Sequence, residues 1–174
     1  KFFVTIKTFY LLRKQPEASK LFSLMKKKYF DFIDIGAFHG VYTNLAIRSK
    51  NCRKLISVEA NYSNYQFLKK VFNSRDVEIK NNIFSLQSGE ISFFVPVLSH
   101  AQYGNLENVL GSGIKGRFEN EVEIKVKSTN LAHLISRINT KSKSLILKVD
   151  IEGMEGDFIK DLYSISLDYD RIII

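Results

Sequence analysis

Hydrophobic and polar positions along the chain change their period several times, and each change predicts an element. Apolar side chains at helical spacing predict two helices over residues 2–14 and 17–27, which break at Pro16. Beyond them, short apolar runs alternate with helical stretches. The strands predicted from these runs span residues 30–34, 54–59, 76–81, 145–149 and 171–174. The helices predicted between them lie within residues 41–48, 61–72, 131–138 and 157–163. In the second of these helices, Ser63 and Gln66 fit a capping box.

This alternation of strands and helices with short connections predicts an α/β fold, in which a mostly parallel sheet carries helices on both faces. We expect the strand order 3-2-1-4-5, counted along the chain, so that the first and fourth strands are neighbours. We interpret residues 1–174 as a single domain, with basic N-terminal helices over residues 1–28 and a core over residues 29–174.

The middle of the chain follows a different pattern. Apolar residues in 83–86 and 91–97 flank the turn-forming Gln87–Glu90, which predicts a hairpin. Residues 98–120 are polar and glycine-rich, so we expect a long loop that acts as a lid. Residues 121–127 alternate strictly between polar and apolar side chains, which predicts a strand with one face in water.

The net charge of +8 is concentrated near the N-terminus. Residues 1–30 hold eight lysine and arginine side chains against one acid, Glu17, so the rest of the chain is nearly neutral. Such a basic segment is typical of contact with nucleic acid or with an anionic membrane. We favour the plainer interpretation, a solvated face of amphipathic helices, because few aromatic side chains interleave with the lysines.

The cysteine content and the hydropathy of the chain indicate the kind of cellular compartment in which the protein works. A single cysteine, Cys52, excludes an internal disulfide and fits a reducing, cytoplasmic compartment. No apolar stretch reaches membrane-spanning length, and the first residues carry charges spaced too evenly for a signal peptide. The chain lacks an initiator methionine and stops within the apolar run Ile172–Ile174. We therefore expect a piece of a longer protein, with a sheet truncated at the C-terminus.

The turn after the first strand carries the strongest candidate chemistry. Small residues let the backbone approach a ligand closely, and the helix that follows offers free N–H groups. Gly36 and Gly40 are spaced more widely than the glycines of a G-x-G-x-x-G fingerprint, so a pyrophosphate is not the best ligand. The wider D-x-G-A-x-x-G turn suits the amino-acid end of S-adenosylmethionine, which indicates a methyl-transfer domain. Both glycines would also relieve a tight strand–helix turn, but together with Glu59 they favour a nucleoside-type ligand. The candidate cofactor-binding residues of this segment are Asp34, Gly36, Ala37, Gly40 and Thr43.

Three further strand ends face the same crevice in the predicted order, at the switch point where open α/β sheets bind ligands. Glu59, 23 residues beyond Gly36, is placed to accept both ribose hydroxyls, although alone it would be a solvated strand end. Asn82 and Ile83 would hold the edge and face of an adenine, but asparagine at a strand end is as often a turn former. Asp150 follows the fourth strand, where a carboxylate can hold the cofactor's ammonium, orient a substrate hydroxyl or bind a divalent cation.

Four segments together resemble the FkbM family of S-adenosylmethionine-dependent methyltransferases: DIGAFHGVYT, SVEANYSNYQFL, GEISFFV and LILKVDIEGMEGDFI. The resemblance extends over residues 29–174, and the run KVDIEGMEG is its most specific part. It implies a Rossmann-like class I methyltransferase fold and O-methylation, usually of hydroxyls on sugars, glycans or polyketide-type metabolites. The site residues it carries over are Gly36, Ala37, Gly40, Glu59, Asp150 and Glu152. The chain departs from the family pattern at Phe38, Ala60 and Ala132.

The reaction expected from this resemblance is an in-line displacement, in which a substrate oxygen attacks the sulfonium methyl group. Asp150 and Glu152 are the first candidates for positioning the acceptor or accepting its proton. His39 is a second candidate, although a lone histidine in a loop is more often structural. No His/Cys cluster has zinc spacing, whereas oxygen ligands around Asp150 would suit Mg²⁺. Cys52 lies at the end opposite the crevice, so we do not expect it to act as a nucleophile for pyrimidine methylation.

Two other functions stay open at this point. One is an RNA methyltransferase that uses the basic N-terminus, and the other is a non-catalytic Rossmann-like binding module. No recognisable RNA-binding module accompanies the lysines, so we expect a small-molecule or glycan acceptor rather than nucleic acid. The sequence leaves the oligomeric state open.

Overall fold

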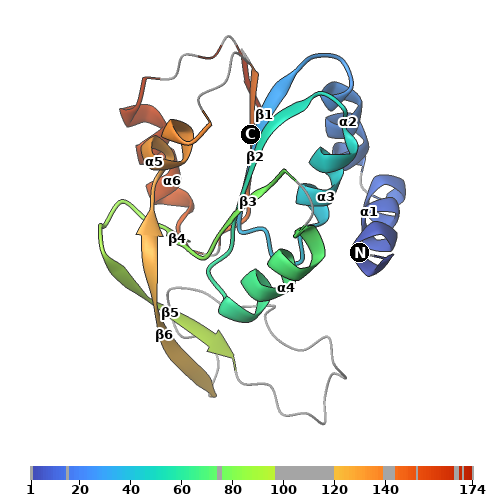
Figure 1. The fold of residues 1–174 in the computed structure, drawn as a ribbon. Coiled ribbons are helices and arrows are strands. Elements are labelled where there is room, and N and C mark those ends of the chain that lie inside the picture. Colours follow the sequence, from blue (N-terminus) through green and yellow to red (C-terminus); the bar gives the residue numbers. More distant parts are fainter. Residues whose placement is uncertain are drawn as a thin grey trace.

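The computed structural model describes residues 2–14, 16–73, 76–96, 120–138, 144–151, 153–166, 169 and 171–173. Its helices are α1 (Phe2–Lys14), α2 (Pro16–Met25), α3 (Val41–Arg48), α4 (Tyr62–Phe72), α5 (Leu131–Ser136) and α6 (Glu155–Ser164) (Figure 1). Its strands are β1 (Phe30–Ile35), β2 (Cys52–Val58), β3 (Glu78–Lys80), β4 (Ile83–Phe84), β5 (Glu90–Pro96), β6 (Glu121–Thr129), β7 (Ser144–Val149) and β8 (Arg171–Ile173). Within these ranges, no helix has the length and apolar character needed to cross a membrane.

Five parallel strands form the central sheet in the order β3-β2-β1-β7-β8. The predicted order 3-2-1-4-5 is therefore confirmed. The short connections of the first three strands allow only a right-handed progression toward one edge, and β7 then pairs on the other side of β1. Ile35 of β1 lies opposite Val58 of β2 and Val149 of β7, so these three strands end together at one edge of the sheet.

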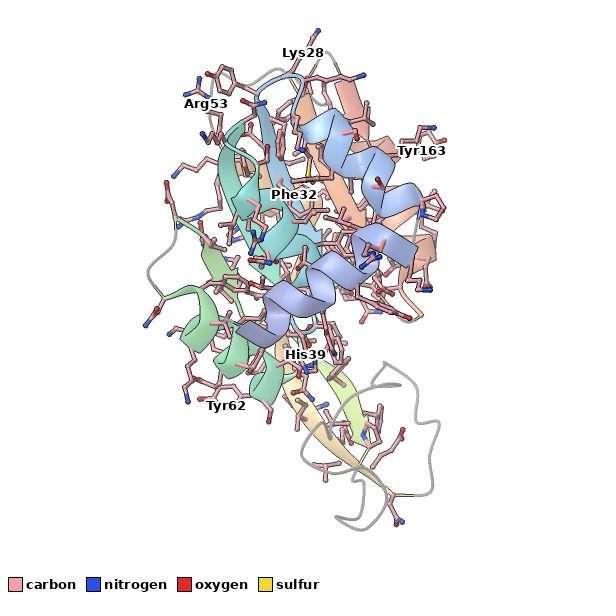
Figure 2. All side chains as sticks on the ribbon, turned by 90° about the vertical axis from the view of Figure 1, so that its right-hand side faces the viewer. Lys28, Phe32, His39, Arg53, Tyr62 and Tyr163 are labelled. Atoms are coloured by element: carbon pink, nitrogen blue, oxygen red, sulfur yellow. The ribbon has the colours of Figure 1, made fainter. Side chains whose placement is uncertain are left out.

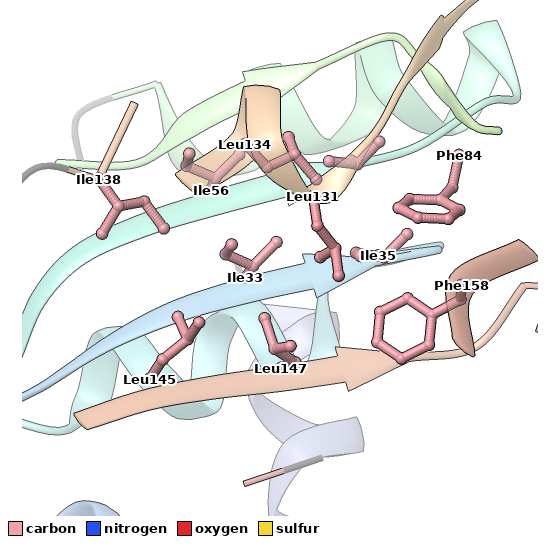
Figure 3. Packing of buried hydrophobic residues seen from close by; sticks show 11 residues of the cluster. Ile33, Ile35, Ile56, Phe84, Leu131, Leu134, Ile138, Leu145, Leu147 and Phe158 are labelled. Atoms are coloured by element: carbon pink, nitrogen blue, oxygen red, sulfur yellow. The ribbon is translucent and has the colours of Figure 1, made fainter. Parts of the chain in front are cut away.

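Helices cover both faces of this sheet, as predicted for a Rossmann-like α/β fold. Successive strand residues point to opposite faces. Ile33 and Ile35 pack against Leu134 of α5 and Phe158 of α6 in one buried cluster (Figure 3). Phe32 points to the other face, where it packs with buried side chains of α2 and α3. Figure 1 shows α5 and α6 on one side of the sheet and α1, α2 and α3 on the other.

The basic N-terminal helices pack on this second face. Val4 of α1 is buried, as are Ala18 and Met25 of α2, and Met25 joins the cluster around Phe32. The three lysines that follow α2, Lys26 to Lys28, are exposed. The apolar stripes of both helices thus cover the core while these lysines face water, as expected for amphipathic helices.

The smaller sheet corrects the predicted hairpin. Its order is β4-β6-β5, so Ile83–Phe84 does not pair with Glu90–Pro96, as the predicted hairpin required. Instead β5 pairs antiparallel with β6 along seven residues, and the short β4 pairs parallel with the end of β6. The alternating pattern of β6 explains this arrangement, because its apolar residues lie opposite those of β5, for example Val126 opposite Ile91. Of the predicted lid, residues 98–119 lie outside the part of the chain that the structure describes.

Candidate functional site

The carboxyl ends of β1, β2 and β7 bring two of the predicted site segments together. The backbone N–H groups of Gly36 and Ala37 each donate to the Val58 carbonyl oxygen, with donor–acceptor distances of 3.0 Å. The Asp150 N–H donates to the Ile35 carbonyl oxygen, also at 3.0 Å. The turn after β1 and the residue after β7 therefore converge on one edge of the sheet, at the topological switch point between β1 and β7.

Both glycines of the turn are required by close packing. Gly36 has a φ of 74°, and a Cβ atom there would overlap the carbonyl oxygen of Asp150. Gly40 also has a φ of 74°, and a Cβ atom there would lie 2.6 Å from side-chain atoms of Leu68 and Phe72 in α4. Left-handed backbone and a lack of space both exclude larger residues. The turn is therefore fixed between β7 and α4, which gives it one defined shape.

Asp34 and Thr43 lie beneath the turn, and both side chains are fully buried. Thr43 Oγ1 donates to Asp34 Oδ2 at 2.7 Å and lies 2.6 Å from Ser57 Oγ. These contacts link α3 to β1 and β2. The two side chains that the sequence predicts as cofactor-binding thus support the turn from below.

Lys148 is a member of this cluster that the sequence analysis missed. Its ammonium donates to the Gly36 carbonyl oxygen at 2.6 Å and lies 3.4 Å from Asp34 Oδ1 and 3.7 Å from Asp150 Oδ2. The Asp34 contact is an ion pair without the directional geometry of a hydrogen bond, because no donor is aligned with Oδ1. The available signal was a lysine within the apolar strand LILKV, in register with Asp34 on the neighbouring strand.

Glu59 holds the backbone of the turn from the end of β2. Its side chain is buried, with Oε2 accepting the Phe38 N–H at 2.7 Å and Oε1 accepting the Asn61 N–H at 2.8 Å. Burial raises the pKa of the Glu59 carboxyl above its usual value, although these two N–H groups, the Asn64 side chain and the positive charge of Lys148 oppose the rise. Phe38 has a φ of 50°, which is rare for a residue with a side chain. The Glu59 carboxylate therefore stabilises an unusual backbone conformation.

Asn82 and Ile83, predicted near an adenine, face the smaller sheet. The Asn82 side-chain amide donates to the carbonyl oxygens of Lys127 and Ser128 in β6. Ile83 is buried in the apolar cluster of the β5–β6 ribbon. The amide that lies beside the end of β2 belongs to Asn81, which donates to the carbonyl oxygens of Glu59 and Ala60 at 2.9 Å each.

His39 lies on the side of the turn that faces α1 and α4. Its ring stacks on Phe38 with centroids 3.8 Å apart and lies 5.3 Å from the ring of Phe67. Its Nδ1 is 3.5 Å from the ammonium of Lys7. Burial and the Lys7 charge lower the pKa of His39 to about 4, so the imidazole is neutral at physiological pH. Figure 2 shows His39 at the end of the core opposite Lys28 and Arg53.

Three acidic residues, Asp150, Glu152 and Glu155, follow β7. The Asp150 side chain is 76% exposed. Glu152 lies outside the described residues. Glu155 opens α6 and accepts the Gly153 N–H, the position expected for an acid in a first helical turn. Among the described residues, no group of three or more His, Cys, Asp or Glu side chains could hold a metal ion.

Cys52 begins β2, at the opposite end of the sheet from this cluster. Burial, together with the negative charges of Asp31 and Asp76, raises the pKa of its thiol to about 12. A thiol with this pKa is almost entirely protonated at neutral pH and is a poor nucleophile. That Cys52 is not the nucleophile of a pyrimidine methylation stays a prediction.

Comparison with known protein families gives a match that includes the residues at this edge of the sheet. The family model described as the methyltransferase FkbM domain matches residues 34–174, which include the turn, Glu59 and the segment after β7. Neither curated proteins nor solved structures give a match. The match covers most of the chain and the whole of the convergent site. The chain therefore belongs to the FkbM methyltransferase family.

Proposed function

We propose that this methyltransferase binds S-adenosylmethionine at the ends of β1, β2 and β7 and transfers its methyl group to a hydroxyl of a sugar, glycan or secondary metabolite. One observation carries the proposal. The Gly36 turn, Glu59 and Asp150 lie at neighbouring strand ends of one edge, within the segment that matches the methyltransferase family. In open α/β sheets this edge, at the switch point between β1 and β7, is where ligands bind.

The residues at this edge fit the cofactor by their chemistry. The Glu59 carboxylate accepts the backbone N–H groups of Phe38 and Asn61, and the Asn64 amide also interacts with it. A carboxylate can accept about four hydrogen bonds, so it keeps the capacity to accept a ribose hydroxyl. The exposed Asp150 carboxylate is available to a cationic group. When bound, S-adenosylmethionine supplies an electrophilic methyl group on a sulfonium.

The acceptor hydroxyl needs to be held in line and to lose a proton. Asp150 is the first candidate for both tasks, because its carboxylate is exposed at the edge where Gly36 and Glu59 meet. If this carboxylate instead holds the ammonium of the cofactor, both tasks fall to Glu152. Glu152, two residues further along, is the second candidate. His39 is the weakest of the three, because a pKa of about 4 makes its imidazole a poor proton acceptor and its ring is stacked on Phe38. A divalent cation held by Asp150 and Glu152 belongs to the same proposal and would show as loss of activity in a chelator.

Isothermal titration calorimetry with S-adenosylmethionine tests the proposal. We expect the wild-type chain to bind and Glu59→Ala to bind at least about tenfold more weakly, since a charge-assisted bond to ribose is lost. Glu90→Ala removes an exposed acid from β5 and serves as the matched control. A wild-type chain that binds no S-adenosylmethionine would instead support a non-catalytic module.

Turnover on an acceptor panel then identifies the substrate class. The panel contains sugars, glycans, hydroxylated metabolites and an RNA oligonucleotide. We expect methylation of a hydroxyl in one of the first three groups. Transfer to RNA alone, abolished when the exposed Lys26, Lys27 and Lys28 are replaced by glutamine, would contradict the proposed acceptor.

A further inference from the structure

We propose that Lys148 and Asp150 form a subsite for the zwitterionic amino-acid end of the cofactor, in which Lys148 meets the carboxylate and Asp150 meets the ammonium. The inference rests on the proposed binding of S-adenosylmethionine and assigns Lys148 a part in it. Its basis is the arrangement of charges around the Lys148 ammonium, together with the difference in burial between the two acids beside it.

Lys148 is held in place from the core side. Asp34 Oδ1 lies 3.4 Å from its ammonium, and the Asp34 side chain is only 1% exposed. Thr43 fixes the other oxygen of Asp34 with a hydrogen bond of 2.7 Å. The Lys148 ammonium also donates to the Gly36 carbonyl oxygen, in the turn itself, at 2.6 Å. These interactions position the lysine ammonium directly beneath the turn after β1.

The contact between Lys148 and Asp150 is of a different kind. The two charged groups are 3.7 Å apart, and the Asp150 side chain is 76% exposed against 14% for Lys148. Ion pairs with an exposed partner contribute little to stability, because water screens them and the side chain loses rotational freedom. Asp150 can therefore exchange Lys148 for a ligand at small cost, while Asp34 keeps Lys148 where it is.

An α-amino acid matches a lysine and an aspartate that are already in contact. Its ammonium and carboxylate are attached to one carbon, so they present opposite charges at a short separation comparable to that of Lys148 and Asp150. The cluster of Asp34, Lys148 and Asp150 carries a net charge of −1 when all three are ionised. S-adenosylmethionine carries a net charge of +1, because its sulfonium adds to a neutral zwitterion. Overall charge and local charge pattern are both complementary.

Two ligands separate this subsite from a general effect on the fold. S-adenosylhomocysteine contains the adenosine and the amino-acid end, whereas 5′-methylthioadenosine contains the adenosine and lacks that end. Calorimetry with both ligands gives a ratio of affinities for each variant. Lys148→Met removes the positive charge, Asp150→Asn removes the exposed negative charge, and Lys160→Met removes an exposed lysine of α6 as the matched control.

We expect Lys148→Met and Asp150→Asn each to weaken the binding of S-adenosylhomocysteine by about ten- to a hundredfold. The affinity for 5′-methylthioadenosine should change by less than about threefold. Lys148→Arg should recover part of the lost affinity, because the charge returns. Asp150→Asn and Lys148→Arg carry the test if Lys148→Met does not fold. If the variants bound both ligands equally more weakly, or bound both as tightly as wild type does, the proposed subsite would be wrong. A wild-type chain that binds neither ligand would instead overturn the proposed function itself.

Discussion

Asp34 and Lys148 lie directly opposite each other on β1 and β7, with the Lys148 ammonium 3.4 Å from the buried Asp34 carboxylate. This pair connects the interior of the sheet to the edge at which we propose that the cofactor binds. A buried carboxylate requires a compensating charge or hydrogen bonds, and Thr43 and Lys148 supply them. The same lysine also contacts Gly36 and Asp150, so the stability of the sheet and the shape of the site depend on one side chain.

Removal of the Lys148 charge should destabilise the protein. Lys148→Met leaves Asp34 buried without its cation, and we expect the free energy of unfolding to fall by about 3 kcal/mol, as when other buried pairs lose one partner. Urea denaturation measures the change. The double variant Asp34→Asn with Lys148→Met should recover part of the loss, because no buried charge remains. A single variant as stable as Lys160→Met would contradict the role of the pair.

Two glycines with similar backbone angles should respond differently to alanine. Gly36 has a φ of 74° and no room for a Cβ atom, whereas Gly153 has a φ of 88° and nothing within 4 Å. We expect Gly36→Ala to cost about 2–5 kcal/mol of unfolding free energy and Gly153→Ala about 1–2 kcal/mol. Thermal and urea unfolding of the two variants gives the comparison. Equal costs would mean that the turn can move away from Asp150.

Glu59 should give the protein a measurable pH dependence. Its folded-state pKa is raised above 4.5 by burial, so the protonated form is favoured in the folded protein relative to the unfolded chain. The stabilising contribution of Glu59 is therefore complete below pH 4.5 and is lost as the pH rises through the folded pKa. Glu59→Gln removes this term. Unfolding free energies of wild type and Glu59→Gln, measured from pH 4.5 to 7, should show a difference that shifts in favour of Glu59→Gln with rising pH. A constant difference would mean that the pKa of Glu59 is not raised.

The thiol of Cys52 should be unreactive in the folded protein. Because its pKa is raised to about 12, almost none of it is thiolate at pH 8. Labelling with 5,5′-dithiobis(2-nitrobenzoate) at pH 8 should be slow in the native protein and rapid in urea. Cys52→Ser should leave methyl transfer unchanged. Fast native labelling combined with loss of transfer would reopen a role for this cysteine.

The parallel sheet followed from the sequence because its signals are local. Buried strands appear as short apolar runs, and short connections restrict their order, so the sequence alone predicts the correct order of β1, β2, β3 and β7. The hairpin predicted over residues 83–97 was wrong because the true pairing is not local. The strand that pairs with β5 is β6, which begins 25 residues after β5 ends. No local sequence pattern predicts a pairing across such a distance.

Two polar residues of the site illustrate the same limit. The predicted capping box of Ser63 and Gln66 makes Ser63 the N-cap, but the N-cap is Asn61, whose side chain accepts from the N–H groups of Ser63 and Asn64. Both residues are good caps by type, and the Glu59 carboxylate that fixes the Asn61 backbone decides between them. Lys148 was missed because sequence reasoning looked at strand ends. Its importance appears only when β7 is placed beside β1 in register.

A crystal structure of the complex with S-adenosylhomocysteine tests the central claim most directly. We expect the ribose hydroxyls on the Glu59 carboxylate and the amino-acid end between the Gly36 turn and the side chains of Lys148 and Asp150. A ligand bound at another edge of the sheet, with Glu59 still bonded only to Phe38 and Asn61, would contradict the account.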